Sequence, residues 1–157
     1  MCRWLYVLVV VGGAACWGCQ TPLAFEAPSL SLTGLTDEEQ ITQILSDVQQ
    51  GMQTKRMYRV VAHLSRNYRD DQGRDYDTMR RYLDDLFEDY RTVIVRRVRP
   101  RVVVQGDEAV AVDTFATIAE PMDPTKTPPI DVQGEVSAFF RRENGEWKIV
   151  KWSPLHG

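Results

Sequence analysis

The spacing of the hydrophobic positions changes once along the chain, near Tyr90. Upstream of that residue, apolar side chains recur every three or four positions, which is the spacing of one helix face. The first helix is predicted to begin at Thr36, because Thr36 and Glu39 stand three residues apart in a capping-box pattern. Each of three predicted helices then has its own apolar stripe: Ile41, Ile44, Leu45, Val48 and Met52; Met57, Val60, Val61 and Leu64; Tyr76, Met79, Leu83, Leu86, Phe87 and Tyr90.

Downstream of Tyr90, β-branched residues and alternating apolar positions predict strands. Compact turns at residues 105–108 and 143–146 join neighbouring strands, and the second holds an Asn-Gly pair that favours a type I′ hairpin. Pro100 cannot donate a ladder hydrogen bond and predicts a bend in the first strand, whereas the four prolines of residues 119–131 predict a long loop. We therefore expect an α+β fold whose mainly antiparallel sheet has four strands, over residues 91–104, 109–118, 132–142 and 147–152.

The N-terminal residues depart from this pattern. A single positive charge at Arg3 precedes the apolar run of residues 4–11 and the small residues 12–15, which is typical of a secretion signal. Because a membrane-spanning helix needs about 20 apolar residues, we expect this segment to be cleaved and not retained as a span. Cys16 and Cys19 follow, and the segment resembles the lipobox of bacterial lipoproteins, in which the cysteine thiol receives a diacylglyceryl group.

This resemblance implies lipid attachment at Cys16 or at Cys19. The predicted organisation is a lipoprotein signal peptide over residues 1–19, a flexible tether rich in Pro, Ser and Thr over residues 20–35, and a folded domain over residues 36–157. Neither cysteine precedes aspartate, the inner-membrane retention mark of the resembled lipoproteins. The resemblance therefore implies a cell-envelope protein bound to the membrane through its N-terminal lipid, in the outer membrane facing the periplasm if the source has two membranes.

The amino-acid composition mainly excludes certain classes of protein and certain kinds of site. The 157 residues are 43% hydrophobic and 26% charged, with a formal net charge of -3. Such values are typical of one folded domain and exclude a disordered polymer, a collagen-like chain and a polytopic membrane protein. No cysteine follows Cys19, so the domain can form no disulfide or thiolate metal site. The acidic balance and the secretion signal argue against a nucleic-acid partner.

One predicted strand is nevertheless strongly basic, and a later strand ends in two more arginines. Such a stripe can contact lipid head groups or other anionic envelope polymers. We favour the alternative, a solvated outer face whose arginines pair with acids such as Asp84, Asp85, Glu88 and Asp89. The arginines concerned are Arg91, Arg96, Arg97, Arg99, Arg101, Arg141 and Arg142.

Few side chains offer catalytic chemistry. The two histidines, His63 and His156, cannot build a multi-histidine metal site, and no phosphate-loop or dinucleotide motif is present, so no metal or other cofactor is expected. His63 lies beside the apolar stripe of the second helix, where it is either a partly buried structural residue, which we favour, or a general base facing a pocket. Asp113 falls on the less apolar face of its strand, so we expect it to face solvent.

The order of these elements resembles the nuclear transport factor 2-like superfamily, which includes the SnoaL-like domains. The resemblance covers residues 36–154, and its best motif is the closing Gly-x-Trp-x-Ile-x-x-Trp pattern of residues 145–152. It implies a cone in which N-terminal helices pack on a curved, mainly antiparallel sheet around a pocket. Family enzymes pair an aspartate with tyrosine or histidine donors there, but no catalytic residue can be assigned by alignment. The candidate pocket residues are Tyr58, His63, Tyr68 and Tyr90, and Tyr82 is a further donor.

Three functions fit these observations. The first is a non-catalytic, lipid-anchored envelope protein whose domain binds a small ligand or an envelope partner. The second is a small pocket enzyme of the dehydratase or isomerase type that uses His63 with tyrosines. The third is a structural module that forms a homodimer through its open sheet. We favour the first, because the resembled fold serves all three classes and no catalytic set can be aligned.

Overall fold

The structure, a computed structural model, describes residues 34–155. The predicted signal peptide with Cys16 and Cys19, most of the predicted tether, and His156 lie outside the described residues. Three helices precede five strands in the order α1 (Asp37–Gln53), α2 (Met57–Val61), α3 (Tyr76–Asp89), β1 (Tyr90–Arg97), β2 (Arg101–Gln105), β3 (Glu108–Pro121), β4 (Ile130–Glu143) and β5 (Glu146–Leu155). This order confirms the predicted α+β class.

Local signals explain where the helices begin. At α1 the Thr36 hydroxyl accepts a hydrogen bond from the Glu39 amide at 3.3 Å, and the Glu39 carboxylate accepts one from the Thr36 amide at 2.8 Å, so the predicted capping box is present. At α3 the Asp75 carboxylate accepts from the Thr78 amide at 2.9 Å. Tyr90, predicted as the last residue of the third stripe, instead opens β1, because the chain passes from helix to strand without a loop.

The sheet has five strands where four were predicted. Its path is β1-β3-β4-β5, and β2 pairs with β3 beside β1, with every pairing antiparallel. The predicted first strand is split around Pro100 into β1 and β2, as its missing N–H requires. The predicted 13-residue loop is shorter, because β3 continues to Pro121 and β4 starts at Ile130. Asn144 and Gly145 both have positive φ, 52° and 85°, in the predicted hairpin turn.

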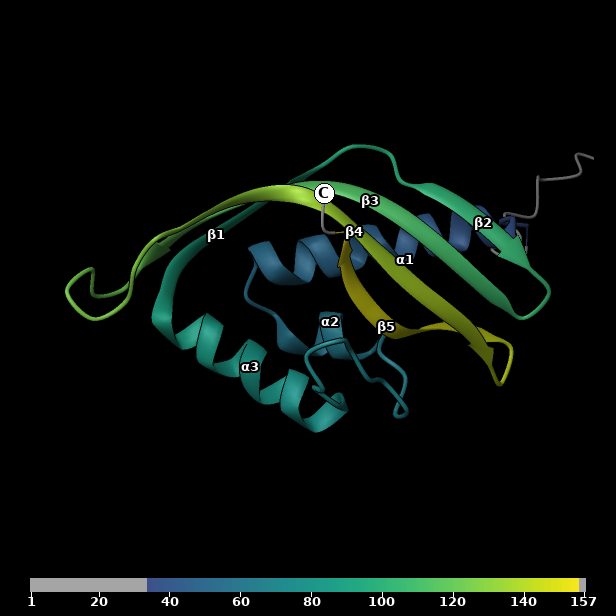
Figure 1. The fold of residues 1–157 in the computed structure, drawn as a ribbon, viewed down its shortest axis with the longest axis horizontal. Coiled ribbons are helices and arrows are strands. Elements are labelled where there is room, and N and C mark those ends of the chain that lie inside the picture. The colour runs from purple at the N-terminus through teal and green to yellow at the C-terminus, as the bar shows by residue number, and fades with distance from the viewer. Residues whose placement is uncertain (1–33, 156–157) are drawn as a thin grey trace, which may run out of the picture. The chain divides into compact units, whose positions relative to one another are not determined.

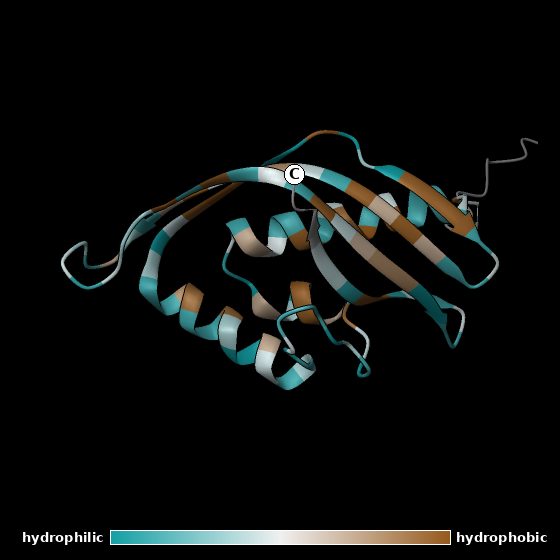
Figure 2. Cartoon of the chain, viewed as in Figure 1, coloured by the Kyte–Doolittle hydropathy of each residue, from teal (hydrophilic) through white to brown (hydrophobic). Residues whose placement is uncertain are grey.

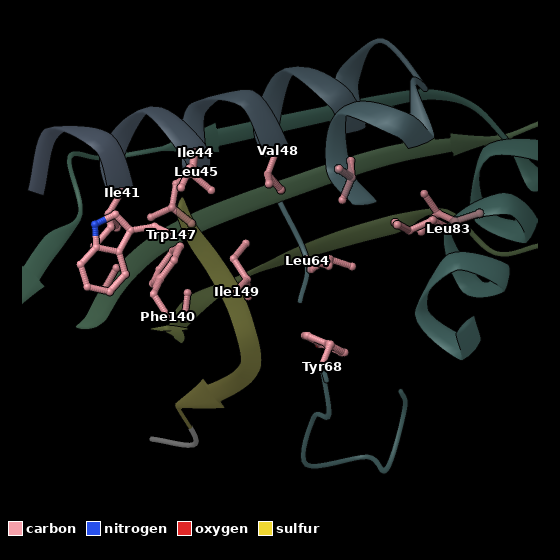
Figure 3. Packing of buried hydrophobic residues seen from close by; sticks show 14 of the residues in the cluster. Ile41, Ile44, Leu45, Val48, Leu64, Tyr68, Leu83, Phe140, Trp147 and Ile149 are labelled. Atoms are coloured by element: carbon pink, nitrogen blue, oxygen red, sulfur yellow. The ribbon is translucent and has the colours of Figure 1, made fainter. Parts of the chain in front are cut away.

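Within the described domain, the long strands arch over the helices, which all lie on one side of the sheet (Figure 1). Figure 2 shows hydrophobic bands along β2, β3 and β4 as well as on the helices. The core lies between these layers, and its fully buried members include Ile41 and Leu45 of α1 and Ile149 of β5. In Figure 3 the side chains of Ile41, Phe140 and Trp147 gather at one end of the core, and Leu83 lies at the other.

The chain after α2 is held at the edge of the sheet by backbone hydrogen bonds. The Ile149 amide donates to the His63 carbonyl at 2.8 Å, and the Ser65 amide donates to the Ile149 carbonyl at 2.9 Å. This pairing fixes the path of the segment that leads to Tyr68, which projects from its loop toward the core (Figure 3). The edge of β5 is thereby partly covered as well.

Candidate functional site

A cavity of about 350 Å³ lies between the helices and the concave face of the sheet. Its wall is mainly apolar and is drawn from all three helices and four of the five strands. The apolar lining residues are Leu45, Val48, Met52, Val60, Leu64, Met79, Leu83, Val95, Phe115, Val136 and Trp152. The polar ones are Gln49, Tyr68, Arg74, Tyr82, Arg97, Asp113 and Thr117. A larger depression of about 810 Å³ beside α1 is open and mostly polar, so the smaller cavity is the better candidate site.

Asp113 and Arg97 form a buried ion pair in the wall of this cavity. The Arg97 Nε donates to the Asp113 Oδ2 at 2.6 Å, and the Arg97 Nη1 donates to the Leu45 carbonyl of α1 at 2.6 Å. The Asp113 side chain is only 2% exposed, and the Arg97 side chain is 9% exposed. The second carboxylate oxygen of Asp113, Oδ1, is buried and has no hydrogen-bond partner among the residues that the structure describes. Unpartnered buried polar atoms are rare in folded proteins.

The prediction that Asp113 faces solvent is wrong. Its side chain points into the domain, on the same face of β3 as the buried Ala109, Ala111 and Ala119. Phe115 and Thr117 belong to this face as well, and both line the cavity. The larger β-branched residues of the strand lie on the opposite face, and Ile118 there is 41% exposed. Comparing the hydrophobicity of the two faces therefore identified the wrong one as the inner face.

A second polar group borders the cavity at the loop before α3. The Tyr68 side chain is buried, and its hydroxyl lies 3.5 Å from the Asp70 Oδ2. Burial raises the pKa of Tyr68, and the charge of Asp70 adds to this effect. Burial also raises the pKa of Asp70, but hydrogen bonds from the Arg74 side chain and backbone outweigh it, so this pKa lies below its ordinary value. The Arg74 Nε donates to the Asp70 Oδ2 at 2.6 Å.

Of the four predicted pocket residues, only Tyr68 lines the cavity. Tyr58 is 63% exposed on α2. The Tyr90 side chain is buried, but its hydroxyl donates to the Pro128 carbonyl at 3.0 Å. His63 lies outside the wall, with its Nε2 at 3.4 Å from the Asp47 Oδ2 of α1. The structure therefore does not bring these four side chains together.

Burial lowers the pKa of His63, and the nearby Asp47 carboxylate opposes this shift only in part. The imidazole thus connects α1 to the chain after α2 without reaching the cavity. This position agrees with the favoured interpretation of His63 as a partly buried structural residue.

Sequence reasoning missed Arg97 and Arg74 as cavity residues and placed Asp113 on the wrong face. One signal was available, because Asp113 is a lone acid within the apolar run of residues 109–118. A charge in such a position either faces solvent or is buried with a partner. Its partner, Arg97, lies on β1, which pairs with β3, and the alternation of that basic strand was too weak to show that Arg97 points inward.

The basic stripe is divided by the fold. Arg97 turns inward, while Arg96, Arg99 and Arg101 are exposed and form no ion pair within residues 34–155. The predicted partners Asp84, Asp85, Glu88 and Asp89 make no ion pair with the stripe in that part of the chain. Arg141 instead lies 3.2 Å from Glu108, and Arg142 lies 2.6 Å from Asp37.

The described residues show neither a membrane-spanning helix nor a cluster of metal ligands. None of their helices is both long enough and apolar enough to cross a membrane. In the same part of the chain, no three His, Cys, Asp or Glu side chains gather where they could hold a metal ion.

Comparison with solved structures places this fold among known proteins. A proposed scytalone dehydratase from Novosphingobium aromaticivorans superposes with a TM-score of 0.65 at 13% identity, over 73% of this chain and 80% of that one. A nuclear transport factor 2-like superfamily protein from Salmonella enterica serovar Typhimurium gives 0.63 at 16% identity, over 75% and 89%. A hexachlorocyclohexane dehydrochlorinase of type 2 gives 0.62 at 15% identity, over 75% and 88%. These likenesses confirm the predicted nuclear transport factor 2-like fold.

Sequence comparison gives the family. No curated protein matches the chain significantly. The model of the SnoaL-like domain matches residues 67–154, which is more than half of the chain and includes β1–β4 with Arg97 and Asp113 and all but the last residue of β5. The chain therefore belongs to the SnoaL-like domain family.

Proposed function

We propose that the domain binds a small, mainly apolar molecule inside the cavity beneath its sheet. The observation that carries this proposal is the mostly apolar wall around about 350 Å³, in which the charged side chains of Arg97, Asp113 and Arg74 are few. This volume lies at the lower end of the range for small-molecule sites, about 300–1,000 Å³. A ligand with one ring or two fused rings fits such a space.

The structural likenesses support a small-molecule site but do not choose the reaction. Similar structures include a proposed dehydratase and a dehydrochlorinase. A shared fold at this level of identity says nothing about substrate or turnover. Binding alone is therefore the main proposal.

A test compares two neighbouring residues of β1. Val95 lines the cavity, whereas Ile94 is 43% exposed on the outer face. We expect Val95→Phe to fill part of the cavity and abolish binding, and Ile94→Phe to leave binding intact. Native mass spectrometry of the gently purified proteins reads out any co-purifying molecule, and thermal shift with added aromatic probes gives a second readout. Equal binding by both variants, or no ligand with any readout, would contradict the proposal.

A second candidate is an enzyme of the dehydratase or isomerase type. The specific observation is that Asp113 and Tyr68 both line the same cavity. A carboxylate can accept a proton while a phenol donates a hydrogen bond to the developing charge. Asp113, and not the predicted His63, would then be the base. Turnover of a candidate hydroxyl-bearing substrate by the wild type, lost in Asp113→Asn while binding persists, would favour catalysis over binding alone.

We also propose that the domain is held in the cell envelope by a lipid on Cys16 or Cys19, as the N-terminal pattern predicts. Intact-mass measurement of the mature protein tests this directly. A single diacylglyceryl mass that disappears in Cys16→Ser or in Cys19→Ser identifies the modified residue. An unmodified mature chain that begins beyond both cysteines would exclude the anchor.

A further inference from the structure

We infer that the ligand of the cavity is electrically neutral and donates one hydrogen bond, from a hydroxyl or an N–H group, to the Oδ1 atom of Asp113. This inference rests on the proposed function and names the chemical class that the cavity accepts. It is carried by the hydrogen bonds and charges around Asp113 and Asp70.

One oxygen of the Asp113 carboxylate, Oδ1, has no hydrogen-bond partner within residues 34–155. The Asp113 Oδ2 is engaged by the Arg97 Nε at 2.6 Å, and Arg97 is itself fixed by its 2.6 Å bond to the Leu45 carbonyl. Neither of these two bonds involves the Asp113 Oδ1. The Oδ1 atom stays buried and without a partner among residues 34–155, in a residue that lines the cavity. A donor from a bound molecule would satisfy it.

The charged side chains that line the cavity are already paired with opposite charges. At the sheet, the Asp113 carboxylate is already paired with the Arg97 guanidinium. At the loop before α3, Asp70 is paired in the same way with Arg74, whose guanidinium also lies 4.8 Å from the centre of the Tyr82 ring. Each lining charge therefore has an opposite charge of its own. An ionic ligand would bring an uncompensated charge into an otherwise apolar space, which is strongly unfavourable.

The two ionic alternatives fail for separate reasons. A carboxylate ligand cannot donate to Oδ1 and would be repelled by it. An ammonium ligand could donate, but it would sit close to Arg97 with only one carboxylate to serve both cations. A neutral alcohol, phenol or amide satisfies the oxygen and adds no charge.

The test titrates the full-length protein at neutral pH with five naphthalene-based probes and follows binding by fluorescence. The probes are naphthol, its methyl ether, naphthalene, naphthoate and naphthylmethylammonium. We expect naphthol to bind at least about tenfold more tightly than the ether or naphthalene, because it alone among these neutral probes can donate to a charged acceptor. Both ionic probes should bind more weakly than naphthalene.

Different results would overturn different statements. Equal affinity for naphthol, its ether and naphthalene would exclude the hydrogen bond to Asp113 but leave the proposed binding function standing. Tighter binding of either ion than of naphthol would exclude a neutral ligand. If none of the five probes binds, the proposed function fails, and the inference fails with it.

The variant Asp113→Asn should reverse the preference for naphthol over its methyl ether. The Arg97 Nε would then hold the amide oxygen, and the amide N–H₂ would take the place of Oδ1 and offer a donor. We expect the methyl ether to bind at least as tightly as naphthol in this variant. Glu135→Gln, which removes an exposed carboxylate from the outer face of β4, should keep the wild-type order of probes.

If Asp113→Asn does not fold, as judged by circular dichroism, the double variant Arg97→Gln with Asp113→Asn removes both charges together. In that variant naphthol should lose most of its advantage over the ether. An unchanged preference for naphthol in either folded variant would show that Asp113 does not contact the ligand.

Discussion

Arg97 and Asp113 bring opposite charges into an apolar interior, where their hydrogen bond offsets the free energy of removing both from water. Such a pair stabilises a fold less than its short distance suggests, because both charges have lost their hydration. Removing only one of the two side chains destabilises the fold much more, since the remaining charge stays buried and unpaired. The Arg97 bond to the Leu45 carbonyl adds a tie between α1 and the sheet.

We expect Arg97→Met to lower the free energy of unfolding by about 3–5 kcal/mol, because it leaves the buried Asp113 charge without a partner. The double variant Arg97→Met with Asp113→Leu should recover much of this loss. Urea denaturation of the single and double variants measures both effects. Arg96→Met, on the exposed face next to Arg97, should change the free energy by no more than about 0.5 kcal/mol. Equal losses in the single and double variants would contradict this explanation.

His63 gives the domain a pH dependence. Burial lowers its pKa in the folded state, so between that value and the ordinary value of about 6.5 the unfolded chain binds more protons. The free energy of unfolding should therefore keep its full value, as far as His63 is concerned, above about pH 6.5. It should fall as the pH drops below that value. His63→Gln should flatten this part of the curve, and Asp47→Asn should steepen it by removing the charge that opposes the shift. Thermal unfolding across this pH range measures the slope, and identical slopes in all three proteins would rule out a contribution from His63.

At the scale of secondary-structure elements, α1 is the support on which the site is built. It contributes Leu45, Val48, Gln49 and Met52 to the cavity, and its Leu45 carbonyl holds Arg97. Its start is determined locally by the reciprocal hydrogen bonds of Thr36 and Glu39. Asp37 of its first turn also accepts from Arg142 at 2.6 Å and from the Trp147 Nε1 at 3.1 Å, which ties this end to β4 and β5.

We expect Thr36→Ala to lower the free energy of unfolding by about 1 kcal/mol, because the Glu39 amide loses its capping acceptor. Thr42→Ala is the matched control within the same helix. The exposed Thr42 hydroxyl only donates to the Glu38 carbonyl at 2.8 Å, and alanine has the higher helix propensity. Chemical denaturation should show a loss for Thr36→Ala alone. A similar loss in both variants would mean that the cap does not determine where α1 begins.

At the scale of the whole domain, the outer face of the sheet carries exposed apolar side chains and charged side chains of both signs. The paired residues Ile94 of the edge strand β1 and Ile118 of β3 are 43% and 41% exposed on this face. Arg96 and Arg101 lie on the β1–β2 side of β3, and Asp131 and Glu135 lie on its β4 side, all of them exposed. A two-fold axis along β3 would lay Arg96 and Arg101 of one copy over the side that carries Asp131 and Glu135 in the other.

We therefore expect the protein to form a homodimer through this face. Ile118→Asp should shift it to a monomer in light scattering, because it places a carboxylate beside the exposed Ile94, within the apolar surface that the dimer would bury. Met122→Asp, at a 59% exposed position beyond the end of β3, should leave the mass unchanged. A wild-type monomer, or a dimer that survives Ile118→Asp, would exclude this mode of pairing.

Local interactions explain what could be predicted. The capping box at Thr36, the helix stripes and the Asn144-Gly145 turn each depend on residues that are close in the sequence, so their signals could be seen there. The order of helices and strands followed from these signals. The split of the first strand at Pro100 was also predicted as a bend, since a missing N–H acts where it stands.

The site depended on contacts between distant residues. Arg97 and Asp113 are 16 positions apart and meet only because β1 pairs with β3, and Leu45 completes the cluster from 52 positions before Arg97. The sequence by itself determined the elements, their order and the α+β class, because short-range hydrogen bonds and hydrophobic spacing specify them. Only the tertiary structure decided which face of β3 is buried, because the helices all pack on the side of the sheet to which Ala109, Ala111, Asp113 and Ala119 point. That choice placed Asp113 inside the domain and among the residues that line the cavity.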